Sequence, residues 1–222
     1  DDINNCIIFT KDSKMGVADK LGNEIVPATY ESIEPWDKGI FKVQKGNRYG
    51  LIDLNNNIIT DIKYNKIGKL ESGSAKVTIT HPTQSWRQLE NDIDKKGKLI
   101  SKYSDLNDEY CLVQEFGLLG VCDKLRNTKI PCLYDEIQLW VDDLVRVKSN
   151  GKWGVINISD NSIRIPIKYD SIGNFIHGVA NVTFVGTKSC INIRGEEVIE
   201  KSIELQNSLA KTLKSGKWGI ED

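Results

Sequence analysis

The chain has 222 residues, and 30 Lys and Arg against 31 Asp and Glu give a formal net charge of −1. A balance so close to neutral argues against binding nucleic acid or an anionic membrane through bulk charge. Hydrophobic residues make up 39% and charged residues 27% of the chain, which is typical of a folded globular protein. No stretch approaches the roughly 18 continuous apolar residues of a spanning helix, so we expect no membrane span.

The cysteines are odd in number and form no CxxC pair. They are Cys6, Cys111, Cys122, Cys132 and Cys190. This spacing argues against a disulfide framework or a zinc site and favours a reducing, cytoplasmic compartment. Export stays open as an alternative, because the chain opens on Asp1 and the start could be processed. With only His81 and His177 as histidines, we expect no metal site and no cofactor.

A short motif recurs along the chain: an aromatic or apolar residue, glycine, two apolar residues (one in the last copy) and an acid or amide. The copies are Met15–Asp19, Tyr49–Asp53, Leu119–Asp123, Trp153–Asn157 and Trp218–Asp222. Gly16 and Gly50 are 34 residues apart, and so are Gly120 and Gly154. Degenerate copies at 90–94 and 188–192 fill the two longer gaps. A fixed period of this length predicts a repeat architecture.

A second motif, opened by tyrosine, keeps step with the first. The tyrosines are Tyr30, Tyr64, Tyr103, Tyr134 and Tyr169. Six residues after four of them comes a large apolar side chain: Trp36, Leu70, Trp140 or Phe175. Thirteen residues after the same four comes valine: Val43, Val77, Val147 or Val182. Apolar residues that recur at the same positions of each repeat are typical of side chains packed in a core.

Each repeat has the pattern of short strands joined by tight turns. In chain order, Phe41–Gln44 alternates apolar and polar residues as a half-buried strand does, and 45–48 has turn chemistry. Tyr49–Asp53 is the returning strand, a second turn covers 55–57, and Ile58–Thr60 is a third strand. Glycine and asparagine in these turns supply the positive φ that hairpins need. The sequence therefore predicts an all-β fold.

The run at 151–157 followed by 165–172, with Lys217–Ile220, resembles the WG-repeat (KWG-repeat) family of bacterial β-repeat proteins. The resemblance extends from about Lys14 to Asp222. It implies a bacterial origin and a repeat fold, but no mechanism.

We expect one domain over 1–222, with units beginning near residues 14, 48, 89, 118, 152 and 187 and a partial unit at 217–222. Units of this size cannot bury an apolar face alone and must stack. We predict a β-propeller of six or seven small blades, with an open β-solenoid as the alternative. The repeat positions expected to hold it together are Gly16, Tyr30, Trp36, Gly50, Tyr64, Gly120, Tyr134, Trp140, Trp153, Gly154, Tyr169, Phe175, Trp218 and Gly219.

The segment 78–91 breaks the register, because the interval between glycine positions grows to 41 residues if Asn91 takes the glycine place. The insertion carries His81, Trp86 and Arg87, which we predict to bind a partner, since tryptophan and arginine are common interface anchors. The alternative is a tolerated surface insertion in which Trp86 covers its own blade or is the displaced repeat tryptophan.

Two further residue sets admit a functional and a structural interpretation. The acids and amides that close the first motif (Asp19, Asp53, Asp94, Asp123, Asn157 and Asn192) could bind cations, but turn-forming hydrogen bonds explain them more simply. The repeated tyrosines could stack on a glycan, but their register favours packing between blades.

We find no nucleophile elbow, P-loop, dinucleotide fingerprint or HExxH motif, and we expect no enzymatic activity. The sequence favours a non-catalytic interaction or scaffold module whose loops bind another protein or a further domain of the same system. A glycan or cell-wall binding module is the first alternative, and a propeller-type hydrolase is the less favoured one.

Overall fold

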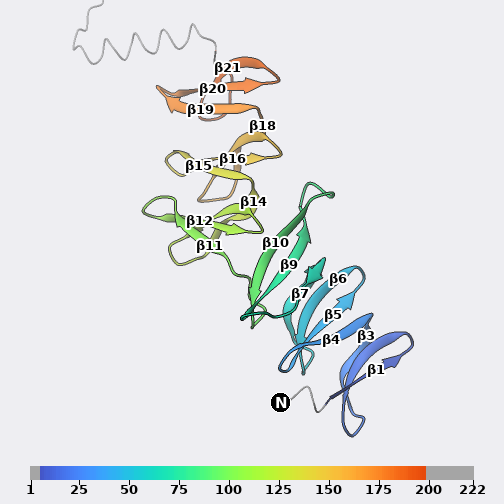
Figure 1. The fold of residues 1–222 in the computed structure, drawn as a ribbon. Helices are drawn as coiled ribbons and strands as arrows, with labels where there is room; N and C mark the ends of the chain where they lie inside the picture. Colours follow the sequence, from blue (N-terminus) through green and yellow to red (C-terminus); the bar gives the residue numbers. More distant parts are fainter. Residues whose placement is uncertain (1–5, 199–222) are drawn as a thin grey trace, which may run out of the picture. The chain divides into compact units, whose positions relative to one another are not determined.

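The computed structural model describes residues 6–198 (Figure 1). These residues form six small antiparallel sheets and no helix, which confirms the all-β prediction. They therefore contain no helix that is long and apolar enough to cross a bilayer. The repeat positions Trp218 and Gly219 and the partial unit at 217–222 lie outside the described residues.

The chain divides into two compact units, Asp1–Lys102 with Gln114–Gly117 and Tyr103–Val113 with Leu118–Asp222. Closure of the sheets into a ring stays a prediction.

The first unit holds three sheets. The first sheet has the strand order β1 (Cys6–Lys11), β2 (Lys14–Asp19) and β3 (Glu24–Tyr30). The second has the order β4 (Ser32–Asp37), β5 (Ile40–Lys45), β6 (Arg48–Asp53) and β7 (Ile58–Tyr64). The third has the order β10 (Gln88–Asp94), β9 (Ser74–Thr80) and β8 (Lys66–Ile67).

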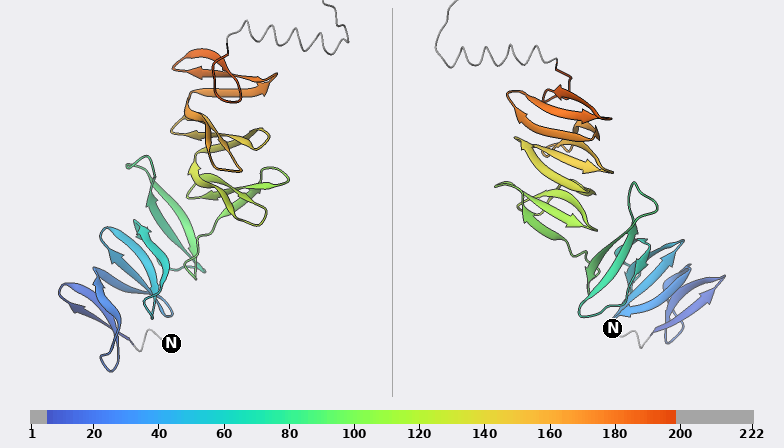
Figure 2. Two further views of the ribbon diagram at one scale, coloured as in Figure 1. Left: turned by 180° about the vertical axis from the view of Figure 1, so that it is seen from behind. Right: turned by 45° about the horizontal axis from the view of Figure 1, so that its top comes forward.

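Three more sheets follow. The fourth has the order β11 (Lys102–Asp105), β12 (Tyr110–Glu115), β13 (Leu118–Asp123) and β14 (Thr128–Tyr134). The fifth has the order β15 (Glu136–Val141), β16 (Leu144–Ser149), β17 (Lys152–Asn157) and β18 (Ile163–Tyr169). The sixth has the order β19 (Ser171–Ile176), β20 (Val179–Phe184) and β21 (Thr187–Ile191). Figure 2 shows these sheets from two further directions.

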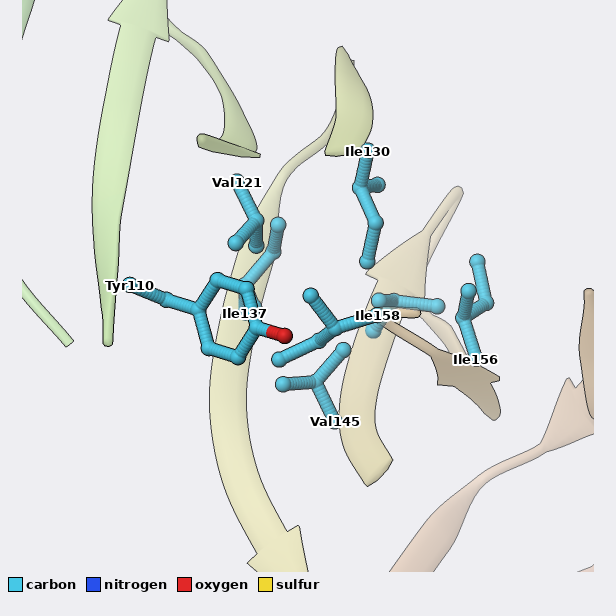
Figure 3. Close-up of a cluster of buried hydrophobic side chains, with 8 residues drawn as sticks. Tyr110, Val121, Ile130, Ile137, Val145, Ile156 and Ile158 are labelled. Atoms are coloured by element: carbon cyan, nitrogen blue, oxygen red, sulfur yellow. The ribbon is translucent and has the colours of Figure 1, made fainter. Parts of the chain in front are cut away.

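Within each unit, neighbouring sheets bury their apolar faces against one another. In the second unit, Tyr110, Val121 and Ile130 of the fourth sheet pack on Ile137, Val145 and Ile156 of the fifth (Figure 3). The first unit has the same type of core, in which Val17 and Val26 of the first sheet meet side chains of the second sheet, including Phe41 and Val43. The core is thus a series of layers between sheets, as expected of units that cannot fold alone.

The glycine of the first motif is required by a backbone contact. Between Trp153↔Tyr169 and Val155↔Ile165 the register of β17 and β18 shifts, which is a β-bulge. A Cβ placed on Gly154 would lie 2.7 Å from the Ile165 carbonyl oxygen. At the other motif glycines, the distance from an added Cβ to a backbone carbonyl oxygen of the neighbouring strand would be 2.6 Å at Gly16, 2.8 Å at Gly50 and 2.5 Å at Gly120. The bulged strand therefore occupies the space that any larger residue would need.

The tyrosine row is mostly buried. Tyr30, Tyr64 and Tyr169 are at most 7% exposed, and Tyr134 is half-buried. Tyr103 departs from the row and is 45% exposed. It follows Asp94 by nine residues, whereas Tyr64 follows Asp53 by eleven, so the shortened turn places it differently.

The tryptophans of the repeat tie successive sheets together. The indole N–H of Trp36 donates at 2.9 Å to the carbonyl of Gly68, which directly follows β8 of the third sheet. Trp153 is half-buried against the core between the fifth and sixth sheets, and the Lys148 ammonium lies 5.4 Å from the centre of its ring. The hydrogen bond of Trp36 and the burial of Trp153 agree with the expectation that these repeat positions hold the fold together.

Candidate functional site

The β9–β10 hairpin carries the longest tip of the hairpins in the first unit. Residues 81–87, called here the β9–β10 tip, join Thr80 to Gln88, which face each other in the ladder. Two residues suffice between β5 and β6. In Figures 1 and 2 the tip projects beyond the neighbouring hairpins of the first unit.

The insertion leaves the repeat register of the hairpin intact. Asn91 lies opposite Val77, as Gly50 lies opposite Val43. The placement of Asn91 at the glycine position is therefore confirmed. The extra residues are accommodated by longer strands and by the tip, so the core beneath is unchanged.

Backbone hydrogen bonds close the β9–β10 tip. The His81 N–H donates to the Arg87 carbonyl at 2.8 Å, and the Arg87 N–H donates to the Gln84 carbonyl at 2.9 Å. The Thr83 N–H donates to the His81 imidazole Nδ1 at 3.2 Å. The tip is thus a loop whose conformation is held by hydrogen bonds between its own residues.

His81 is buried at the base of the tip, with 3% of its surface exposed. Because Nδ1 accepts from Thr83, the neutral imidazole carries its hydrogen on Nε2. That Nε2 is buried and has no hydrogen-bond partner among the described residues. His81 is therefore buried beneath the tip, where it contacts Thr83, and its part in binding a partner stays a prediction.

Trp86, in contrast to His81, has 80% of its surface exposed. Trp86 therefore does not cover its own sheet, and Glu90, not Trp86, precedes Asn91 at the place of the repeat tryptophan. Binding of a partner through Trp86 stays a prediction, with a tolerated surface insertion as its alternative. Arg87, the next residue, is half-buried. Among the three predicted binding residues, Trp86 alone presents a large apolar surface to solvent.

The acids at the end of the first motif form hydrogen bonds within turns. The Asp123 carboxylate accepts the N–H groups of Leu125 and Asn127 at 2.9 Å, and the Asn127 side-chain amide at 2.9 Å. These hydrogen bonds, from the Asn127 amide first, hold the pKa of Asp123 below its ordinary value. Asn157 and Asn192 make the corresponding bonds to backbone N–H groups with an uncharged amide. The turn-forming interpretation therefore accounts for these side chains.

One sheet carries a thiol-rich face that sequence reasoning missed. Cys111, Cys122 and Cys132 cluster with Val113 on the fourth sheet. Burial raises the pKa of the Cys122 thiol. Aligning the repeats would have found the cluster, because Cys122 takes the place of Ile52 and Ile156. Within residues 6–198, no group of three or more His, Cys, Asp or Glu is arranged to hold a metal ion.

Two open hollows lie in the second unit. One, of about 430 Å³, is lined by residues of β19, β20 and β21 that include Ser171, Lys188 and Cys190. The other, of about 630 Å³, includes Asp142 and Asp143, and the Asp143 carboxylate already accepts from the Ser159 hydroxyl at 2.5 Å. Neither lining contains a histidine. Neither hollow brings together a nucleophile, a base and a group that orients the base.

The model of a family described as the WG containing repeat matches the chain four times, over residues 15–49, 49–79, 120–153 and 153–184. Together these segments make up more than half of the 222 residues. The β9–β10 tip lies in the interval between the second and third matches. No curated protein matches the chain.

Solved structures give only distant likenesses. The extracellular domain of a putative one-component system from B. thetaiotaomicron is 10% identical over 90% of this chain and 34% of its own, with a TM-score of 0.31. A protein of unknown function from Bacteroides caccae is 11% identical over 87% and 91% of the two chains, with a TM-score of 0.28. The C-terminal WD40 domain of Sif2 is 13% identical over 86% and 64%, with a TM-score of 0.27. The chain spans about a third of the length of the first of these.

Proposed function

The chain belongs to the WG-repeat family, and from this premise we propose that it is a non-catalytic interaction module that binds a protein partner through the β9–β10 tip. The observation that carries the proposal is the 80% exposure of Trp86 on a loop closed by backbone hydrogen bonds. A loop already ordered in the free protein loses little conformational entropy on binding.

The residue types of the tip support a protein partner. Tryptophan and arginine are enriched among the residues that dominate protein interfaces, and an exposed indole offers a large apolar area for burial. His81 supports this surface from its base, where Nδ1 accepts the Thr83 N–H. Trp86 is thus the anchor, Arg87 the neighbouring polar contact and His81 the positioning residue.

The partner is another protein or a further domain of the same system, in a reducing compartment such as the bacterial cytoplasm. All five cysteines are free thiols, which supports a reducing compartment. The near-neutral net charge of −1 supports a partner recognised by local contacts rather than by a strong overall field.

A glycan or cell-wall ligand is the second candidate, and Trp86 is also the observation that favours it. An exposed indole stacks on sugar rings as readily as it packs on a protein. A repeated glycan surface would require the tyrosine row in solvent, whereas Tyr30, Tyr64 and Tyr169 are buried. The glycan function would therefore rest on the tip alone, which makes the protein partner the preferred proposal.

Affinity purification from the native host with mass spectrometry tests the proposal. The baits are the wild type, the double variant Trp86→Ala with Arg87→Ala, and Leu21→Ala as the matched control. Leu21 is 88% exposed on a different turn, so it also removes an exposed apolar side chain. We expect the double variant to recover at least tenfold less of the partner and Leu21→Ala to recover as much as the wild type.

A purified partner must then bind the wild type directly with the same dependence on Trp86. Unchanged thermal unfolding of the double variant shows that the scaffold is intact. Equal recovery by all three baits would refute the tip as the binding surface. Binding of the wild type, but not the double variant, to a glycan array or peptidoglycan would instead establish the second candidate.

A further inference from the structure

The fourth sheet places two cysteines opposite each other on neighbouring antiparallel strands. β12 and β13 have six residues each and are joined by two residues, and β16 and β17 of the fifth sheet have the same lengths and the same link. In the fifth sheet Val145 lies opposite Ile156. Counting the same number of residues from the turn places Cys111 of β12 opposite Cys122 of β13.

The other sheets carry an apolar pair at this place. The pairs are Ile7↔Ala18, Phe41↔Ile52, Ala75↔Ile93, Val145↔Ile156 and Ala180↔Ile191. Cys111 and Cys122 are buried as well, with 4% and 2% of their surfaces exposed. Two thiols fill such a place as small hydrophobic groups do, and they add the capacity to form a covalent bond across the strands.

The spacing of the two cysteines suits a disulfide. Residues directly opposite each other in an antiparallel pair have Cα atoms about 4.5 or 5.5 Å apart, and disulfides join Cα atoms about 4.4–6.8 Å apart. Cys111 and Cys122 also belong to one cluster of buried side chains, so both thiols lie on the same face of the sheet. Cys132 contacts this cluster, but its thiol donates to the Val113 carbonyl at 3.5 Å, two residues from Cys111 along β12.

Charged groups beside Cys111 favour its ionisation. The Cys111 thiol donates to Asp105 Oδ1 at 3.7 Å, and the Lys124 ammonium donates to the same oxygen at 2.8 Å. The carboxylate can take the thiol proton and pass it to water, since the Asp105 side chain is 86% exposed, while the ammonium stabilises a thiolate. Burial raises the pKa of Cys122, so its thiol stays protonated near neutral pH. Cys111 is therefore suited to attack an oxidant first, and Cys122 to attack second.

We propose that Cys111 and Cys122 are a redox-active pair that hydrogen peroxide converts to a disulfide. The Cys111 thiolate attacks one peroxide oxygen, the O–O bond breaks, and the released hydroxide takes up the thiol proton, which leaves a Cys111 sulfenic acid and one water. The Cys122 sulfur then displaces the sulfenic hydroxyl, which leaves with the Cys122 proton as a second water. The two thiols lose two electrons and the peroxide gains them. An external dithiol reverses the reaction by thiol–disulfide exchange.

The disulfide restrains the β12–β13 hairpin. It closes residues 111–122 into a ring, and this hairpin supplies Gln114–Gly117 to the first unit and its other residues to the second. Hydrogen peroxide is uncharged and close to water in size, so local opening of the strands admits it more readily than larger reagents. A reversible bond of this kind is typical of redox sensing in a reducing compartment. The pair acts independently of the β9–β10 tip.

Peptide mass spectrometry of the full chain tests the pair. The reduced protein is treated with hydrogen peroxide, the remaining thiols are blocked with N-ethylmaleimide in urea, and the digest is analysed without reduction. We expect the Cys111–Cys122 link to be at least tenfold more abundant than any other pairing and to disappear with dithiothreitol. Cys122→Ala should accumulate a Cys111 sulfenic acid that dimedone traps. Cys190→Ala, which removes a half-buried thiol outside the pair, should form the link as the wild type does.

Hydrogen exchange gives a second measurement that needs no substitution. Amides of β12 and β13 should exchange at least tenfold more slowly in the oxidised wild type than in the reduced one, whereas those of β16 and β17 should be unchanged. Thermal unfolding of the reduced variants checks that they fold. A dominant link from Cys132 to either partner, a Cys111–Cys122 link that forms only in urea, or oxidation that yields no link would overturn the proposal.

Discussion

The indole N–H of Trp140 donates to the backbone carbonyl of Gly173 at 2.8 Å and so links the fifth sheet to the sixth. Trp140 also packs edge-on against Phe175, with ring centres 5.2 Å apart. Trp36 makes the same bond to Gly68. The repeated tryptophan therefore combines an apolar contact with one directional bond between layers.

Replacing Trp140 separates these two contributions. Trp140→Phe keeps a ring but loses the N–H, which leaves the Gly173 carbonyl without this donor, and we expect a loss of about 1 kcal/mol in the free energy of unfolding. Trp140→Ala removes the ring as well and should cost about 3 kcal/mol. Urea unfolding at pH 7 measures both. Trp86→Phe is the control and should stay within about 0.5 kcal/mol of the wild type, because Trp86 is exposed.

Adding one methyl group at Gly154 should destabilise the protein more than its size suggests. Its Cβ would lie 2.7 Å from the Ile165 carbonyl oxygen and 2.6 Å from the Ile167 side chain. Backbone in a ladder cannot move aside easily, so we expect Gly154→Ala to cost about 2 kcal/mol. At Gly173 the nearest atom, the Asn181 carbonyl oxygen, is 3.2 Å away, so Gly173→Ala should cost clearly less. Equal losses for the two variants would contradict the close-approach explanation.

The Asp123 turn predicts a pH dependence. Hydrogen bonds, from the Asn127 amide first, lower the folded-state pKa of Asp123. The stabilisation is therefore present above the unfolded pKa of about 3.9 and is lost as the pH falls through the lower folded pKa. We expect the urea midpoint of the wild type to fall more steeply below about pH 4 than that of Asp123→Asn.

Asp123→Asn is the matched variant because it keeps an acceptor oxygen without a titratable charge, as Asn157 does naturally. Urea midpoints between pH 3 and pH 7 measure the difference between the two proteins. Parallel curves across that range would show that the turn carboxylate does not contribute to acid sensitivity.

Alkylation should distinguish the five thiols. Cys111 and Cys122 are 4% and 2% exposed, and burial raises the pKa of Cys122, so the reactive thiolate is both shielded and scarce. Cys6, Cys132 and Cys190 are half-buried. We expect iodoacetamide to modify these three thiols before Cys111 and Cys122 in the native protein, and all five at similar rates in urea. Peptide mass spectrometry measures the modification of each cysteine. Early modification of Cys122 in the native protein would show that the thiol-rich face opens.

The repeated sequence motifs were sufficient to predict the strands, because the residues that define the repeat register are those that face the core. Val77 opposite Asn91 and the buried Tyr64 follow directly from that register. The divergent third unit shows the limit. Tyr103 shares the motif but is exposed, since its burial depends on the length of the preceding turn and on which side chains reach it.

The candidate site was predicted in position but not in detail. A stretched register marked the insertion, and the residue types suggested binding. That His81 is buried and Trp86 exposed depends on how the loop closes, through the bond from the His81 N–H to the Arg87 carbonyl. Sequence spacing alone carries no information about that closure.

The sequence repeat and the sheet are offset from each other. The matched segment 120–153 supplies most of β13 and all of β14 to the fourth sheet, and then β15 and β16 to the fifth. Excising it would join Leu119 to Gly154 and fuse the start of β13 to the end of β17, giving a hybrid sheet of β11, β12, the fused strand and β18. A recombination event between two copies of the gene segment would therefore shorten or lengthen the protein by one whole sheet and leave no strand without a partner. This architecture thus has a simple route to variants of different length.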